Sequence, residues 1–236
     1  MVKYLTRSVL NSEILRIIRE GPYQSISAAD GRAGLLLENL LGIEGGNHDV
    51  ADAVGCELKT SINPNTPVTL FHKEALPRGS CKVMVHRYGW PATYKGLPVK
   101  SFRATIYGSW NSKYQDATID VKADNDTVAL FHNKERLVHW DSNALISGAA
   151  AKLRNMMLVQ ARDNKDGTIS FLRGYLLETF QPFKFIKAIE DGIVAIEYDA
   201  RTKPNSASIR NHGTKFRIKE GDLHKIYDKV EVIGDE

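Results

Sequence analysis

The sequence predicts an α/β fold in which a mixed central β-sheet is flanked by helices. Three observations support this prediction. Several short stretches between residues 54 and 140 alternate apolar and polar residues with the two-residue period of a strand. Apolar residues at helical spacing occur at the N-terminus and again between the later strands. Helices and strands do not alternate regularly along the chain, which favours a mixed sheet over a doubly wound parallel one.

Four segments have the apolar spacing of an amphipathic helix. Residues 5–20 carry apolar side chains at this spacing, and Gly21-Pro22 provides a stop. Residues 33–41 form an apolar stripe with Glu38 inside it, and a glycine follows. Two further helices are expected at residues 144–154 and 182–191.

Strands are expected wherever the two-residue alternation persists. The first two, 54–62 and 67–72, are separated by the turn-forming Asn63-Pro64-Asn65, so we expect them to form a hairpin. The others are expected at 101–107, 116–122, 126–132, 136–140, 156–161, 169–177, 193–199 and 214–218. The middle of the chain is therefore expected to be mostly β-structure.

The composition suits one large domain that spans residues 1–236. Of these residues 42% are hydrophobic and 25% are charged, and no internal repeat or low-complexity linker interrupts them. Cys56 and Cys81 have no partner at redox-motif or zinc-ligand spacing, so a disulfide framework is not expected. The sequence has no run of about twenty apolar residues, and its N-terminal segment is charged. We therefore expect a soluble, cytoplasmic protein without a membrane partner.

Positive charge is concentrated in one stretch of the chain. The formal net charge is only +4, which by itself does not indicate a polyanionic partner. Between Arg201 and Lys219, however, six basic residues occur without an acidic one. Asparagines and serines lie between them, which is typical of a loop that contacts phosphates and reads bases. The alternative interpretation is a solvated loop.

The segment from Asp52 to Lys59 carries the best candidate for a catalytic centre. The alternation of a strand puts Glu57 and Lys59 on one face, with Cys56 and Leu58 directed into a core. Asp52 arrives from just before the strand. Two carboxylates and the backbone carbonyl of Leu58 make an oxygen-rich site that suits a hard cation such as Mg²⁺.

These residue types fit phosphodiester hydrolysis. The reaction needs an activated water and relief of the negative charge that builds on the phosphate, and a divalent cation supplies both. The ammonium group of Lys59 can orient the water and neutralise further charge. Because no Ser, Cys or His nucleophile with its own base stands beside these carboxylates, we expect direct attack by water.

Taken alone, the Glu57-x-Lys59 triplet is a weak signal. About one such triplet is expected by chance in a chain of this length. Asp120-Val-Lys122, preceded by Asp116, and Asp163-Asn-Lys165 are further acid-x-Lys matches. The alternative interpretation of Glu57 and Lys59 is the solvated face of an ordinary strand.

Five short motifs follow one another along the chain: the helix with Glu38, Asp52-x4-Glu57-x-Lys59, Val68-Thr-Leu-Phe-His72-Lys73, Arg87-Tyr88-Gly89 and His212-Gly-Thr-Lys-Phe-Arg217-Ile. In this order they resemble the motifs of the MvaI/BcnI family of restriction endonucleases. This family is related to the mismatch-repair nickase MutH within the PD-(D/E)xK nuclease superfamily. Each motif is short, but together they extend over nearly the whole chain.

The resemblance implies a magnesium-dependent type II restriction endonuclease in which Mn²⁺ can replace Mg²⁺. Asp52 and Glu57 correspond to the metal-binding acids, Lys59 to the catalytic lysine and Glu38 to the helix glutamate beside the site. The resemblance also implies a monomer, without an obligate protein partner, that nicks the two strands of double-stranded DNA in turn at a CC-N-GG-type site. The family fold has a catalytic lobe, expected roughly at 1–105, and a recognition lobe, expected roughly at 106–236, which together form a DNA-binding cleft.

The resemblance also implies a set of DNA-binding residues in or next to the later motifs: His72, Lys73, Arg87, Tyr88, Arg210, His212, Lys215 and Arg217. His72 resembles the histidine of the BcnI branch that probes the central base pair, where that branch accepts G·C or C·G. Lys215 departs from this branch, which has a second histidine there, so the central-pair preference stays open. Arg217 matches an arginine of the recognition motif, and an arginine can contact O6 and N7 of guanine together.

Simpler interpretations of these residues stay open. His72 can cap a strand end, Arg87 and Tyr88 can be a buried structural pair, His212-Gly213 can shape a turn, and Glu38 can be the exposed edge of its helix. Two other functions stay open as well. One is a MutH-like strand-specific nickase that a partner switches on, and the other is a DNA-binding module without catalytic activity.

Overall fold

The chain folds into two compact units. The computed structural model describes residues 6–29, 31–43, 55–109, 112–114 and 117–234. Unit 1 comprises residues 1–68, 149–181 and 219–236, and unit 2 comprises residues 69–148 and 182–218. The sequence led us to expect one boundary near residue 105. The observed units are discontinuous instead, because the chain passes between them several times.

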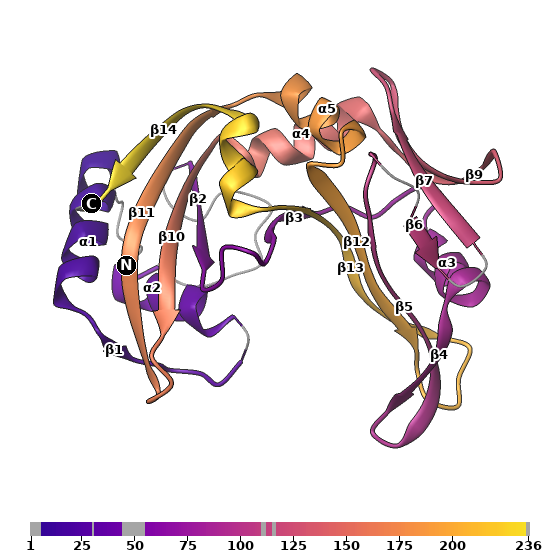
Figure 1. Ribbon diagram of the computed structural model, residues 1–236, viewed down its shortest axis with the longest axis horizontal. Helices are drawn as coiled ribbons and strands as arrows, with labels where there is room; N and C mark the ends of the chain where they lie inside the picture. The colour runs from indigo at the N-terminus through magenta and orange to yellow at the C-terminus, as the bar shows by residue number, and fades with distance from the viewer. Residues whose placement is uncertain (1–5, 30, 44–54, 110–111, 115–116, 235–236) are drawn as a thin grey trace. The chain divides into compact units, whose positions relative to one another are not determined.

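Unit 1 contains a five-stranded mixed sheet (Figure 1). Its strands are β1 (Tyr23–Gln24), β2 (Cys56–Ser61), β10 (Asn155–Asp163), β11 (Thr168–Phe180) and β14 (Tyr227–Ile233). The order is β1-β11-β10-β2, and β14 also pairs with β11. The β2–β10 pair is parallel, whereas β11 pairs antiparallel with each of its neighbours. In the part of the chain that the structure describes, β2 pairs only with β10 and is an edge strand of this sheet.

Two helices cover one face of this sheet (Figure 1). Helix α1 (Arg7–Glu20) begins after Thr6, whose side-chain oxygen accepts a hydrogen bond from the backbone N–H of Val9. Helix α2 (Arg32–Leu41) ends at Gly42, which has the left-handed backbone conformation that glycine adopts readily. The buried residues of both helices join one hydrophobic core with side chains of β2, β10 and β11. Both helices agree with the sequence prediction.

The expected hairpin of the first two strands is wrong. The turn itself forms, because the side chain of Asn63 accepts a hydrogen bond from the backbone N–H of Asn65. After the turn, however, β3 (Val68–His72) pairs with β13 (Ile209–Ile218) in another sheet. The partner of β2 is β10, which lies about a hundred residues later in the sequence. Local turn chemistry therefore identified the turn but not the strand pairing.

Unit 2 contains two further sheets, one of five strands and one of four. The five-stranded sheet has the order β3-β13-β12-β5-β4, and the four-stranded sheet has the order β6-β7-β8-β9. The remaining strands are β4 (Trp90–Tyr94), β5 (Leu97–Ile106), β6 (Ser112–Tyr114), β7 (Ala117–Ala123), β8 (Thr127–His132), β9 (Glu135–Asp141) and β12 (Val194–Thr202). The helices are α3 (Ser80–Tyr88), α4 (Ser142–Leu153), which runs into unit 1, and α5 (Pro182–Glu190).

Aromatic side chains fill the core of unit 2. Phe71 stacks on Phe216 at a centroid distance of 5.0 Å, and Trp140 meets Phe216 edge-on at 5.5 Å. Phe102 and Tyr198 form a second edge-on pair at 5.5 Å. These contacts bury one face of the five-stranded sheet and leave the other face for polar side chains.

Several elements of the structure were not expected from the sequence. They are α3, β1, β4, β6, β14 and the short 3-10 helix η1 (Glu220–Lys225). Strand β13 also starts five residues earlier than the sequence indicated, at Ile209. None of the helices in the described residues is long and apolar enough to cross a membrane.

Candidate functional site

Glu57 and Lys59 form an ion pair on β2 of unit 1. The Nζ atom of Lys59 lies 2.5 Å from Oε1 of Glu57, and their side chains are 24% and 2% exposed. The interpretation of both residues as an ordinary solvated strand face is therefore wrong for Glu57. A carboxylate removed from water needs charged or hydrogen-bonding partners, and Lys59 is one of them.

The two faces of β2 have different surroundings. Cys56 and Leu58 belong to the hydrophobic core beneath α1 and α2, as the alternation of the strand predicted. On the opposite face, Glu57 and Lys59 are in register with Met156 and Leu158 of β10, both almost completely buried. The ion pair therefore lies beside apolar side chains, where the attraction between opposite charges is stronger than in water.

The C-terminal part of unit 1 contributes a buried tyrosine near this pair. The hydroxyl of Tyr227 donates a hydrogen bond to the carbonyl of Leu153 at 2.8 Å. Burial raises the pKa of Tyr227 well above its ordinary value, and the nearby Cys56 and Glu57 raise it further. This arrangement was not predicted, because Tyr227 begins a strand that was not expected from the sequence.

A second polar pair lies further along the same face of the sheet. Gln160 of β10 is in register with Ser61, two residues beyond Lys59, and its side-chain amide donates a hydrogen bond to Glu220. Sixty residues separate Gln160 from Glu220. No spacing rule could have connected them, so the sequence interpretation missed this pair.

The expected metal ligands are only partly within the described residues. Asp52 lies outside them, whereas Glu57 and Leu58 lie on β2. The carboxylate and backbone carbonyl of these two residues are oxygen donors, which fits a hard cation such as Mg²⁺. The described residues contain no group of three or more His, Cys, Asp or Glu side chains arranged to hold a metal ion.

Glu38 lies on α2, the helix that packs against β2. Gly34, four residues earlier and therefore on the same helical face, approaches this strand. A Cβ atom at Gly34 would lie 3.5 Å from the side-chain oxygen of Thr60. Glu38 itself is half-buried, which differs from a fully exposed helix edge.

The other acid-x-Lys triplets have different surroundings. Asp163 accepts hydrogen bonds from both the backbone N–H and the Nζ of Lys165, and it also pairs with Arg32. These interactions, the backbone hydrogen bond first, lower the pKa of Asp163 to about 2. In the third triplet, Lys122 lies over the ring of Phe131, with Nζ 5.1 Å from the ring centroid. Asp116 lies outside the described residues.

Unit 2 brings two of the expected DNA-binding motifs together. The backbone N–H of Lys73 donates to the carbonyl of Thr214 at 3.0 Å, where β3 meets β13. Gly213 has a φ of +86°, and a Cβ atom there would lie 2.9 Å from Cδ2 of His72. The glycine is therefore needed both for the backbone conformation and for the approach of the imidazole. His212 and Gly213 lie inside β13 rather than in a turn, at the point where the register between β12 and β13 shifts, and Gly213 also lies against His72.

Five charged residues alternate in sign across one face of the five-stranded sheet of unit 2. We call Arg103, Asp199, Lys215, Glu197 and Arg217 the charged row. Glu197 binds Nζ of Lys215 at 3.1 Å with one oxygen and Nη1 of Arg217 at 2.5 Å with the other. Asp199 binds Arg103 at 2.9 Å and lies 3.6 Å from Nζ of Lys215. The sequence predicted the two β13 cations but not the acids of β12 that hold them.

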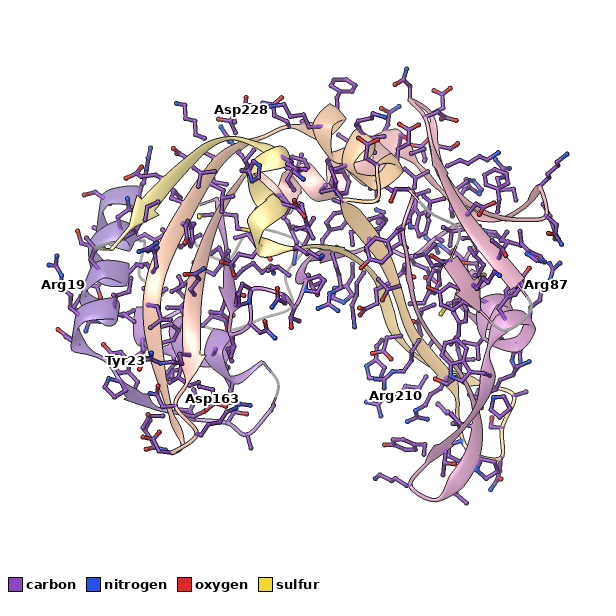
Figure 2. The ribbon with its side chains drawn as sticks, in the orientation of Figure 1. Arg19, Tyr23, Arg87, Asp163, Arg210 and Asp228 are labelled. Carbon is purple, nitrogen blue, oxygen red and sulfur yellow. The ribbon has the colours of Figure 1, made fainter. Side chains whose placement is uncertain are left out.

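Arg87 and Tyr88 lie on α3 rather than at the end of a strand. The guanidinium of Arg87 binds both oxygens of Glu135, at 2.9 and 2.7 Å. Tyr88 is buried and meets His132 edge-on at 5.6 Å. Figure 2 shows Arg87 far from Arg210 within unit 2. Tyr88 is therefore buried, as the simpler interpretation described, whereas Arg87 is exposed and pairs with Glu135 on the surface.

Solved structures of a known nuclease share this fold. One, described as a restriction endonuclease MvaI–cognate DNA substrate complex, matches with a TM-score of 0.83 and 22% identity over 99% of both chains. Another, of restriction endonuclease MvaI in the absence of DNA, matches with a TM-score of 0.58 and 20% identity. This match covers 99% of our chain and 98% of that chain. These likenesses confirm the expected α/β fold with a mixed sheet.

The sequence was also compared with protein-family models and with curated proteins. No curated protein matches the chain. A model of the MvaI/BcnI restriction endonuclease family matches residues 11–227, which include most of both units. The chain therefore belongs to the MvaI/BcnI restriction endonuclease family.

Proposed function

We propose that this protein is a magnesium-dependent type II restriction endonuclease that hydrolyses phosphodiester bonds in double-stranded DNA. The observation that carries the proposal is the partly buried Glu57–Lys59 pair on β2, within a chain that the family model covers almost completely. Structural acids and lysines of a strand are usually solvated, whereas a catalytic pair needs a defined, partly desolvated geometry. We assign the catalytic role to unit 1, which contains this pair.

Asp52, Glu57 and the backbone carbonyl of Leu58 would hold the magnesium ion, or a manganese ion in its place. When bound, a divalent cation supplies Lewis acidity toward the phosphate and acidifies a water molecule. Glu57 contributes a carboxylate whose position is fixed by the surrounding sheet. Glu38, on the neighbouring helix α2, would support the site from its edge.

Lys59 would act on the reacting groups directly. Its Nζ is held 2.5 Å from Oε1 of Glu57, so the ammonium group has a defined position before substrate binds. From there it can orient the attacking water and neutralise the charge that develops on the phosphate oxygens. Because this geometry exists in advance, little reorganisation is needed during the reaction.

Unit 2 would read the target sequence. In this proposal Arg217 contacts guanine, Lys215 and His72 lie near the central base pair, and Lys73, Arg210 and His212 contact the backbone or neighbouring bases. The target would be a short CC-N-GG-type site with a central G·C or C·G pair. We further propose that the enzyme works as a cytoplasmic monomer that nicks one strand and then the other.

Incubation of supercoiled plasmid with the purified protein and magnesium tests this function. We expect open circles to appear first and linear DNA to follow, and run-off sequencing of the products to identify one short site. Persistent open circles would favour a strand-specific nickase. Sequence-specific binding without any cleavage would reject the enzymatic proposal in favour of a DNA-binding module.

A further inference from the structure

A pocket of about 450 Å³ lies at one end of the five-stranded sheet of unit 2. It is formed by β4, β5, β12 and β13, and its principal charged and aromatic lining residues are Trp90, Tyr94, Arg103, Asp199, Arg201 and Arg210. His212 lines it as well. Three arginines and a histidine therefore face a single carboxylate, which makes the pocket suited to an anion.

Arg201 is held in a defined orientation at this pocket. Its guanidinium lies 3.5 Å from the centroid of the Tyr94 ring, which is the distance of a stacked cation–π contact. Its Nη1 also donates a hydrogen bond to the carbonyl of Thr202. A stacked guanidinium loses little additional freedom on binding an anion, so the contact prepares Arg201 for a ligand.

The two strands that carry this pocket place like charges opposite each other. Arg201 of β12 pairs in register with Arg210 of β13. Like charges directly opposite on an antiparallel ladder destabilise the sheet. The acid among the lining residues, Asp199, already binds Arg103 at 2.9 Å. An anion bound between Arg201 and Arg210 would remove this repulsion.

The pocket continues the face that bears the charged row. Residues 197, 199 and 201 of β12 share one face because side chains alternate along a strand. Arg217 pairs with Ala195 and Arg210 pairs with Arg201, so six residues of β12 separate the two arginine positions of β13. At about 3.3 Å per residue this is roughly 20 Å. A site of five base pairs is about 17 Å long. The distance from Arg217 to the pocket is therefore slightly longer than such a site.

We propose that this pocket binds backbone phosphates of DNA outside the sequence that Arg217 reads. The inference rests on the proposed function, because it takes duplex DNA as the ligand and Arg217 as a base-reading residue. Continuity with the charged row favours a polyanion that extends along the sheet over a small free anion. The contact would be independent of sequence and would add affinity from DNA flanking the target.

Binding to duplexes of two lengths tests this proposal. Both carry the site found by run-off sequencing, with flanks of about two or about eight base pairs on each side. Affinities are measured in the Glu57→Gln background, so that binding is followed without cleavage. We expect the Glu57→Gln protein to bind the longer duplex more tightly than the shorter one. Adding Arg201→Gln should weaken binding to the longer duplex about tenfold at 0.1 M salt, and so remove much of this difference. The salt slope on the longer duplex should fall by about one.

Two further variants keep the result interpretable. Arg210→Gln should cause a similar loss on the longer duplex without lowering the thermal unfolding midpoint, because it also removes the repulsion with Arg201. Arg136→Gln changes an exposed arginine of β9 in the same unit and should leave the difference in affinity between the two duplexes intact.

An equal loss of affinity on both duplexes, or no loss, would overturn the proposal. If magnesium-dependent cleavage by the wild type persists in that case, only this inference fails, whereas absence of all cleavage would reject the proposed function itself.

Discussion

Two acid-x-Lys triplets of unit 1 form carboxylate–ammonium pairs in very different surroundings. In the first, Glu57 and Lys59 lie on β2 with side chains 2% and 24% exposed. In the second, Asp163 and Lys165 lie at the turn between β10 and β11, with side chains 12% and 82% exposed. Asp163 accepts the backbone N–H of Lys165, so its carboxylate holds the turn together. The same spacing therefore serves a turn in one place and a candidate catalytic centre in the other.

The difference shows what makes a short motif informative. Both pairs have short distances, 2.5 and 3.0 Å, so distance does not separate them. The surroundings do, because Glu57 is removed from water on a strand whose neighbours are apolar. A charge kept in such a place is costly unless it has a structural or functional role. The comparison therefore predicts opposite responses of the two triplets to substitution.

The largest expected difference is in cleavage. Glu57→Gln should reduce the rate of plasmid cleavage in magnesium by about 10³-fold or more, because in the proposed site the change removes a metal-binding charge without changing the size of the side chain. Asp163→Asn should leave the rate unchanged. Both variants are to be compared with wild type by single-turnover kinetics on the same plasmid. Equal losses in both would remove the distinction between the triplets.

The next largest effect concerns stability. Lys59→Met leaves the nearly buried carboxylate of Glu57 without its ammonium partner, which should lower the free energy of unfolding by about 3 kcal/mol. Lys165→Met breaks a pair whose lysine is exposed, and should leave that free energy unchanged within error. Urea unfolding of both variants measures the two values. A small effect of Lys59→Met would show that its main role is in the reaction rather than in folding.

A smaller effect extends the comparison to the charged row of unit 2. Glu197 holds both Lys215 and Arg217, so Glu197→Gln should loosen the two cations and remove a negative charge from the face that we propose contacts DNA. The ratio of affinity for cognate to random duplex should fall by about fivefold, with random binding slightly tighter. Glu190→Gln on α5, at a half-exposed surface ion pair, is the matched control. If Glu197→Gln changes both affinities by the same factor, Glu197 does not position base-reading groups.

The smallest effect is a change in acid stability. The pKa of Asp163 is lowered to about 2, mainly by the backbone N–H of Lys165. Because the folded-state pKa lies below the unfolded one, this carboxylate stabilises the protein above about pH 4, and that contribution is lost as the pH falls toward 2. Asp163→Asn should therefore flatten the dependence of the unfolding midpoint on pH between 4 and 2. A variant that retains the full slope would show that other carboxylates cause it.

The sequence predicted elements whose stabilising contacts are local. Helices α1 and α2 follow from apolar spacing and their end signals, and β2 follows from alternation. Helix α3 was missed because Ser80 to Tyr88 mixes polar and β-branched residues, and its helix depends on burial of residues such as Met84 and Val85. Burial of this kind comes from packing that no local pattern encodes.

For the candidate site, too, the sequence predicted the residues of local motifs but not their distant partners. Glu57, Lys59, Lys215 and Arg217 stand in short motifs, and the family resemblance selected them. The partners that define their environment come from elsewhere in the chain. Tyr227 comes from the last strand, and Glu197 lies on β12, about twenty residues before the cations that it binds. Such contacts depend on strand register, which alternation alone does not specify.

The order in which unit 1 is synthesised has a consequence for a cell that makes this protein. Its sheet combines an early, a middle and a late portion of the polypeptide, and the late portion supplies β14 and Tyr227. A nascent chain that has not yet reached residue 219 lacks these parts, so the sheet that supports Glu57 is incomplete. We therefore expect a prematurely terminated translation product of this DNA-cleaving family to be inactive, because its unit 1 lacks a strand of the sheet.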